Sequence, residues 1–215
     1  MSADMSTYLS PLAEDLKLHW PGNRTVNIVC HGHSVPSGYF ATPMVDTFNA
    51  YPHLLHRALK ERFPFAVINV IVTGIGGESS DCGYRRMDDV LGHRPGLLTI
   101  DYGLNDRRLG LEPARNAWRL MIEAALGRGI KVLLLTPTWD ADEKGPGGQS
   151  GLWRHAVQIR ELADEYGVGL ADSYAAFLRH VQAGGGLSDL LSWSNHPNRR
   201  GHGLVCDELM RWFPL

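Results

Sequence analysis

The groups that acyl-transfer chemistry uses occur at four separate points of the sequence. The hydroxyl of Ser34 follows a short apolar run, and a glycine-rich stretch occupies residues 73–79. The amide of Asn105 and the imidazole of His196 come later in the chain. Acyl transfer needs a nucleophile, a base that takes its proton, and hydrogen-bond donors for the oxygen that becomes negative. A fold that brings these four points together would build the active site of a serine hydrolase.

Two other kinds of site use the same stretches. His31 and His33, in the segment CHGHS, have the spacing of a metal-binding pair, and Asp101 or His196 would be the third ligand of a metal-dependent hydrolase. The glycines of TGIGGESS suit a phosphate-binding loop, but no Gly-Lys-Ser/Thr follows and the spacing misses the dinucleotide fingerprint. A metal-dependent hydrolase and a non-catalytic, flavodoxin-like module for a nucleotide or sugar therefore stand as alternatives. The serine hydrolase itself needs no metal and no cofactor.

Short apolar runs alternate with longer amphipathic stretches along the chain, which predicts a parallel sheet with helices on both faces. The predicted strands are residues 26–30, 66–72, 97–100, 131–136 and 168–171. The predicted helices are residues 50–62, 81–91, 112–126, 152–166, 173–181 and 203–212.

Five such strands predict a three-layer α/β/α fold with the flavodoxin-like strand order 2-1-3-4-5, formed as one domain from residues 1–215. In such sheets, function gathers in the loops beyond the carboxyl ends of the strands. The stretches around Ser34, residues 73–79 and Asn105 each follow a predicted strand, so we expect them to meet at this edge. The Gly/Pro-rich residues 142–151 are expected to form a loop at the same edge.

The composition indicates neither a nucleic-acid partner nor a membrane span. The 215 residues carry a net charge of −2 and contain no basic cluster, so a nucleic-acid partner is not expected. No segment reaches the roughly 20 apolar residues of a membrane span, and the N-terminal stretch does not have the pattern of a secretory signal. The three cysteines are expected to be free thiols, which is typical of a cytoplasmic protein.

Four short blocks resemble those of the SGNH (GDSL-like) hydrolases. Gly32-His33-Ser34 resembles their Gly-Asp-Ser block, and Gly77 resembles the glycine of their second block. Gly103-Leu104-Asn105-Asp106 matches their Gly-x-Asn-Asp block, and His196-Pro197 resembles the final block. All four occur in the family's order, which implies the SGNH fold and the activity of a serine esterase on short acyl esters such as acetyl groups on carbohydrates.

The resemblance also implies roles for individual residues. Ser34 would be the nucleophile and His196 the general base. The backbone N–H groups of Ser34 and Gly77 and the side-chain amide of Asn105 would form the oxyanion hole.

Two positions depart from the family pattern. The family usually has Asp three residues before the histidine, where this chain has Trp193. Asp189 is a possible third member, but we favour a Ser34–His196 dyad in which a carbonyl from residues 191–195 orients the base. His33 replaces the Asp of the first block; we expect it to point away from Ser34, steady the turn and be dispensable, and we expect His31 to pack against a neighbouring loop.

Overall fold

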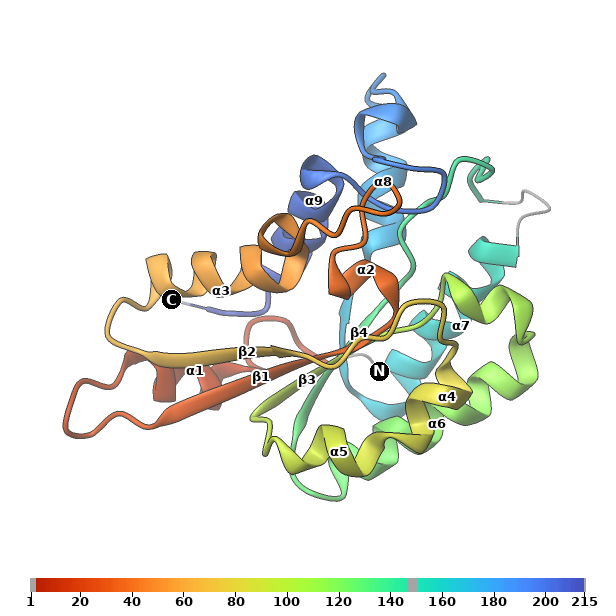
Figure 1. Ribbon diagram of the computed structural model, residues 1–215. Coiled ribbons are helices and arrows are strands. Elements are labelled where there is room, and N and C mark those ends of the chain that lie inside the picture. The colour runs from red at the N-terminus through yellow and green to blue at the C-terminus, as the bar shows by residue number, and fades with distance from the viewer. Residues whose placement is uncertain (1–2, 147–150, 215) are drawn as a thin grey trace.

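A computed structural model describes residues 3–146 and 151–214, and a parallel sheet of five strands lies at its centre (Figure 1). The strands are β1 (Thr25–Gly32), β2 (Val67–Val72), β3 (Leu97–Asp101), β4 (Lys131–Leu135) and β5 (Gly169–Ala171). Their order is β2-β1-β3-β4-β5, and all neighbouring pairs are parallel. The predicted α/β class and strand order are thus confirmed.

Helices cover both faces of this sheet (Figure 1). The α-helices are α1 (Ser10–Lys17), α2 (Ser34–Ser37), α3 (Tyr51–Arg62), α4 (Ser80–Arg85), α5 (Met87–Gly92), α6 (Leu111–Leu126), α7 (Gly151–Tyr166), α8 (Ser173–Gln182) and α9 (Arg199–Met210). Short 3₁₀ turns lie at η1 (Thr47–Asn49), η2 (Asn105–Arg108) and η3 (Leu187–Asp189).

The two faces of the sheet carry separate hydrophobic cores because strand side chains alternate between them. On β1, Ile28 and Cys30 enter the core formed by α1, α3, α8 and α9, whereas Val29 enters the core formed by α5 and α6. On β4, Leu133 enters the first of these cores and Leu134 enters the second. This packing fixes the sheet and holds the carboxyl ends of β1, β2 and β3 side by side.

Four helical segments differ from the sequence-based prediction. Helices α1 and α2 were not predicted, and the segment predicted as one helix over 81–91 is divided at Arg86 into α4 and α5. The last helix begins at Arg199, four residues before its predicted start, because the side chain of Asn198 caps it by accepting hydrogen bonds from the backbone N–H groups of Arg200 and Gly201.

The Gly/Pro-rich loop expected at residues 142–151 follows β4, but residues 147–150 lie outside the described part of the chain. Within the described part, no helix combines the length and apolar character needed to cross a bilayer.

Candidate active site

Ser34 lies on a tight turn between β1 and α2. The strand ends at Gly32, which pairs with Asp101 of the neighbouring strand β3. A Cβ atom at position 32 would lie only 2.5 Å from the carbonyl oxygen of Asp101, so the close approach of the two backbones requires glycine. The turn therefore begins directly at the sheet edge and places the hydroxyl of Ser34 among the loops that follow the strands.

His196 approaches this hydroxyl from the other end of the chain. Its Nε2 atom lies 3.0 Å from Oγ of Ser34, within hydrogen-bond distance. The loop that carries it is held by Ser192, whose backbone N–H and hydroxyl both donate to the carbonyl of His196 at 2.9 and 3.1 Å. The structure thus brings together the predicted nucleophile and the predicted base.

The second nitrogen of His196 contacts a main-chain group. Nδ1 lies 3.1 Å from the carbonyl oxygen of Phe40, in the segment that follows α2. Because a carbonyl only accepts, Nδ1 carries the proton and the lone pair of Nε2 faces Ser34. The expectation of a backbone carbonyl is met, but its expected place in residues 191–195 is wrong.

Asp189 lies elsewhere. Its carboxylate accepts a hydrogen bond from the backbone N–H of Gly186 at 2.9 Å and lies 3.4 Å from Nε2 of His180. The carboxylate of Asp189 therefore binds groups around η3 and does not orient His196.

Burial lowers the pKa of His196, and the neighbouring His33 lowers it further, while the carbonyl of Phe40 acts in the opposite direction. The net shift is downward. The imidazole is therefore neutral at pH 7, which is the form that accepts a proton.

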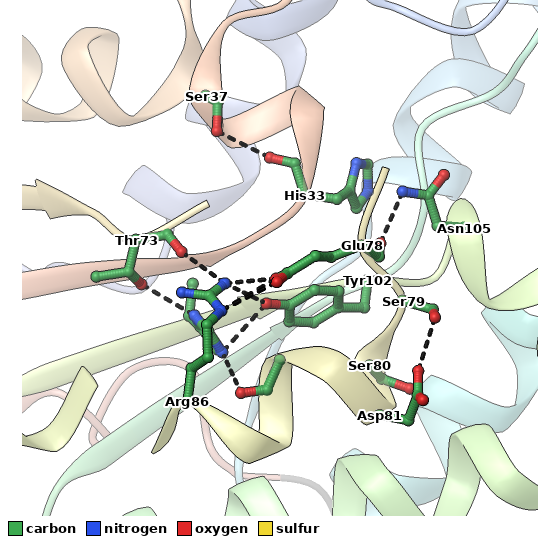
Figure 2. A network of polar contacts seen from close by, with 12 residues as sticks. His33, Ser37, Thr73, Glu78, Ser79, Ser80, Asp81, Arg86, Tyr102 and Asn105 are labelled. Carbon is green, nitrogen blue, oxygen red and sulfur yellow. Dashed lines mark hydrogen bonds and ion pairs between the residues drawn. The ribbon is translucent and has the colours of Figure 1, made fainter. Parts of the chain in front are cut away.

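Asn105 and Glu78 link the loops after β3 and β2. The Nδ2 atom of Asn105 donates to the carbonyl oxygen of Glu78 at 2.7 Å (Figure 2), and Oδ1 accepts from Arg108 at 3.3 Å. These two contacts define which way the amide faces. The bond to Glu78 occupies one of the two N–H groups on Nδ2. Gly77, which directly precedes Glu78 in this loop, has φ +83°, a backbone conformation that favours glycine.

An ion pair secures the loop that carries Gly77. The guanidinium of Arg86 donates to both carboxylate oxygens of Glu78 and, at 3.0 Å, to the carbonyl of Thr73, as Figure 2 shows. Arg86 is the residue at which α4 and α5 separate. The division of the predicted helix is therefore tied to the loop beside the nucleophile.

Asp106 fixes the same loop from the side of β3. Its carboxylate accepts from the backbone N–H of Ser80 at 2.8 Å and from the indole N–H of Trp118 at 2.7 Å. Burial raises its pKa against the effect of these two bonds. Asp106 therefore holds this loop through a backbone amide, and its bond to Trp118 joins the loop to helix α6.

The two histidines of CHGHS have different surroundings. Nδ1 of His31 lies 2.9 Å from the hydroxyl of Thr73, and Nε2 lies 3.1 Å from both the carbonyl of Gly83 and the hydroxyl of Tyr102. Burial lowers the pKa of His31 to about 4. His31 therefore joins neighbouring loops, as expected.

His33 differs from the prediction. Its Nδ1 atom lies 3.4 Å from Oγ of Ser34, so the expectation that this side chain points away is wrong. Nδ1 also accepts from the backbone N–H of Val35 at 3.3 Å, which steadies the turn. Among the residues that the structure describes, no three His, Cys, Asp or Glu side chains are grouped so as to hold a metal ion.

Sequence reasoning did not find the parts played by Phe40 and Arg108. Phe40 contributes a carbonyl, which every residue has, so no residue type signals it. Arg108 is a charged side chain shortly after a strand, and such side chains are usually exposed, so its residue type does not signal a role. Its position three residues after Asn105, on the same short turn, was the available signal.

Comparison with known proteins assigns a family to this geometry. Residues 30–204 match the model of the GDSL-like Lipase/Acylhydrolase family. The chain belongs to this family. The recognised blocks around Ser34 and Asn105 lie within the matched range, and the His196 block does too. As a GDSL-like hydrolase, the protein is a carboxylic ester hydrolase.

Several solved structures share this fold. An acetylxylan esterase from Geobacillus stearothermophilus, Axe2, superposes with TM-score 0.75 at 20% identity, covering 88% of this chain and 94% of that one. A two-domain esterase active on acetylated mannans gives TM-score 0.78 at 19% identity, covering 98% of this chain and 53% of that one. The esterase EstA from Pseudoalteromonas sp. gives TM-score 0.65 at 20% identity, covering 86% and 94%. No curated protein sequence matches this GDSL-like hydrolase.

Proposed function

We propose that this protein is a serine esterase that removes acetyl groups from O-acetylated carbohydrates. The observation that carries the proposal is the 3.0 Å contact between Nε2 of His196 and Oγ of Ser34, with Nδ1 of the same ring on the carbonyl of Phe40. A serine hydroxyl is a weak nucleophile until a base accepts its proton. The contact supplies that base in the correct tautomer.

In the acylation step, Oγ of Ser34 attacks the carbonyl carbon of the ester while its proton moves to Nε2 of His196. The oxygen that becomes negative is bound by the N–H groups of Ser34 and Gly77 and by the Nδ2 hydrogen of Asn105 that does not bind Glu78. Each such donor contributes about 3–4 kcal/mol to transition-state stabilisation. Arg108 keeps the amide in the orientation that offers this hydrogen.

Collapse of the intermediate breaks the bond between the carbonyl carbon and the alcohol oxygen. The alcohol leaves with the proton held on Nε2 of His196, and an acyl group remains on Ser34. A water molecule then attacks this acyl group while His196 takes its proton. The second intermediate collapses by breaking the bond to Oγ, which receives the proton from Nε2 of His196, so the carboxylic acid is released and Ser34 is regenerated. Atoms and charges balance over the cycle without a metal or cofactor.

The substrate class rests on the proteins of similar fold. Axe2 is an acetylxylan esterase and the two-domain enzyme acts on acetylated mannans. Both activities release a short acyl group from a sugar hydroxyl. This common feature supports an acetylated carbohydrate as the substrate here.

The test compares wild-type protein with Ser34→Ala on 4-nitrophenyl esters of increasing acyl length and on acetylated xylo- and manno-oligosaccharides. We expect hydrolysis fastest for acetyl esters, unaffected by a chelator, and reduced at least a thousandfold by Ser34→Ala. Ser6→Ala, at an exposed position in the N-terminal segment, is the control and should retain activity. Near-wild-type turnover in folded Ser34→Ala protein would overturn the nucleophile assignment, and inhibition by the chelator would favour the metal-dependent alternative.

A further inference from the structure

The aromatic ring of Tyr39 borders the active site from the segment that follows α2. Its centroid lies 5.9 Å from the centroid of the His196 imidazole, and the two ring planes make an angle of 45°. The same ring reaches the loop after β2, because a Cβ atom at position 76 would lie only 2.9 Å from the hydroxyl oxygen of Tyr39. Gly76 directly precedes Gly77. Tyr39 therefore lies between the base and the glycine loop of the proposed oxyanion hole.

The backbone holds Tyr39 in this position. Its N–H donates to the carbonyl of Ser34 at 3.1 Å, and its backbone pairs with that of Val45 in an antiparallel bridge. The next residue, Phe40, supplies the carbonyl that contacts Nδ1 of His196. Tyr39 thus belongs to the short segment that follows the nucleophile and orients the base, so its position relative to the reacting atoms is fixed.

Part of the ring is open to a substrate. Tyr39 is 40% exposed, although one edge of its ring packs against Gly76. A larger residue at position 76 would push the ring out of this place, so the glycine there allows the ring to remain close to the loop. An exposed aromatic surface next to the base is therefore a built part of the site.

The alcohol part of an ester is bound on the side of the base. When the alcohol leaves, its oxygen takes the proton from Nε2 of His196, so that oxygen must come within about 2.6–3.2 Å of Nε2. The oxygen that becomes negative points instead toward the N–H of Gly77. A side chain that lies between His196 and Gly76 consequently borders the alcohol as it leaves.

We propose that Tyr39 selects the alcohol part of the substrate by stacking its ring against the sugar that carries the acetyl group. The inference rests on the proposed function and names the residue that recognises its carbohydrate. A pyranose ring presents C–H groups on its faces, and these weakly positive hydrogens pack favourably against the negative face of an aromatic ring. A small alcohol such as ethanol has no ring to make this contact. Tyr39 is thus a specificity-determining residue.

The first test compares two acetyl esters with different alcohols, acetylated xylobiose and ethyl acetate. Tyr39→Leu keeps the apolar bulk and removes the aromatic face. The ratio of kcat/KM for acetylated xylobiose to kcat/KM for ethyl acetate should fall about five- to tenfold. The loss should appear as a higher KM for the sugar ester, because stacking acts equally in the ground state and the transition state. Tyr39→Phe keeps the ring and should keep the ratio.

Tyr84→Leu is the matched control. Tyr84 on α4 is exposed to nearly the same extent, 38%, but it lines a separate hollow with Met87 and Leu91 of α5 and Ala124 of α6. Its replacement should leave the ratio unchanged. An unchanged ratio in Tyr39→Leu would overturn the inference, because a merely structural effect on His196 slows the hydrolysis of both esters equally.

A second series of substrates separates the alcohol side of the site from the acyl side. Ethyl acetate, ethyl propionate and ethyl butyrate share their alcohol and differ in the acyl chain. The order of their kcat/KM values should be the same in Tyr39→Leu as in the wild type. A Tyr39→Leu protein that gained activity on the butyrate would place Tyr39 against the acyl chain and would overturn the inference.

Binding without turnover gives an independent measurement. Isothermal titration calorimetry with acetylated xylobiose should give a Kd about five- to tenfold higher for Ser34→Ala/Tyr39→Leu than for Ser34→Ala. Circular dichroism checks that each variant is folded, and Tyr39→Met, which also keeps the apolar bulk, replaces Tyr39→Leu if that variant does not fold. Equal Kd values for the two proteins would overturn the inference alone.

A failure of the proposed function appears differently in the same experiments. Hydrolysis that survives Ser34→Ala would overturn the nucleophile while the Kd comparison still decides the role of Tyr39. Wild-type protein that hydrolyses ethyl acetate but neither binds nor hydrolyses acetylated xylobiose would overturn the proposed carbohydrate substrate and this inference together.

Discussion

The carbonyl oxygen of Phe40 lies 3.1 Å from Nδ1 of His196, at the point where a Ser-His-Asp triad places its carboxylate. A carbonyl selects the same tautomer as a carboxylate, but it carries no charge to stabilise the imidazolium. The base is therefore well oriented and weak, in agreement with its lowered pKa.

The weak base predicts an unusual pH profile. Because the pKa of His196 lies below the ordinary histidine value of 6.5, the acid limb of kcat/KM should fall below pH 6.5. Measurement of kcat/KM on 4-nitrophenyl acetate from pH 4 to pH 8 checks this. His196→Ala should remove nearly all activity, whereas His93→Ala, at an exposed position, should leave it unchanged. An acid limb centred above pH 6.5 would contradict the prediction.

Removal of the side-chain amide of Asn105 should lower kcat. Asn105→Ala should lower kcat by about a hundred- to a thousandfold with little change in KM, because the amide is used mainly in the transition state. Arg108→Ala should also lower kcat, but by a smaller factor, because this change only frees the amide of Asn105 to rotate. The exposed Asn116→Ala is the control. If Asn105→Ala raised KM and left kcat intact, Asn105 would be a substrate-binding residue instead.

Loss of the indole N–H of Trp118 should destabilise the fold. Trp118→Phe leaves a buried carboxylate oxygen of Asp106 without its donor, which costs about 1–3 kcal/mol in the free energy of unfolding. Trp212→Phe removes an indole bond to the neutral carbonyl of Leu170 and should cost less. Urea denaturation of both variants measures the difference. Equal losses would show that the charge of Asp106 adds nothing to the bond.

Buried histidines predict a loss of stability in acid. Burial lowers the pKa of His31 to about 4 and that of His202 to about 3, while both titrate near 6.5 in the unfolded chain. The unfolded state therefore binds more protons below pH 6.5, and stability falls as the pH decreases from there toward 4. Each histidine should contribute a loss of about 2 kcal/mol between pH 7 and pH 5.

Urea unfolding at the two pH values tests this difference. His202→Gln, which keeps an acceptor near the N–H of Tyr51, should reduce the pH dependence even if it lowers stability at pH 7. An unchanged dependence in that variant would exclude His202 as a source.

The fold was predictable because its strands are short, apolar and covered on both faces, and their periodicity is visible in the sequence. Helix α1 was missed although Leu12 and Leu16 form an apolar stripe, since eight residues give few repeats of the helical period. Ser34 and His196 could be assigned from their blocks. The carbonyl of Phe40 and the position of Tyr39 beside His196 could not, because they depend on how segments distant in sequence pack together.

The nucleophile and its base are 162 positions apart in the chain. Strand pairing between β1 and β3 can form the turn at Ser34 long before the segment that carries His196 has docked, because contacts between distant positions carry a larger loop-closure cost. Hydrolytic activity should therefore be among the last properties to return during refolding, later than the far-ultraviolet signal of the helices and sheet. The rate at which activity returns then measures the final docking of the C-terminal segment onto the sheet edge.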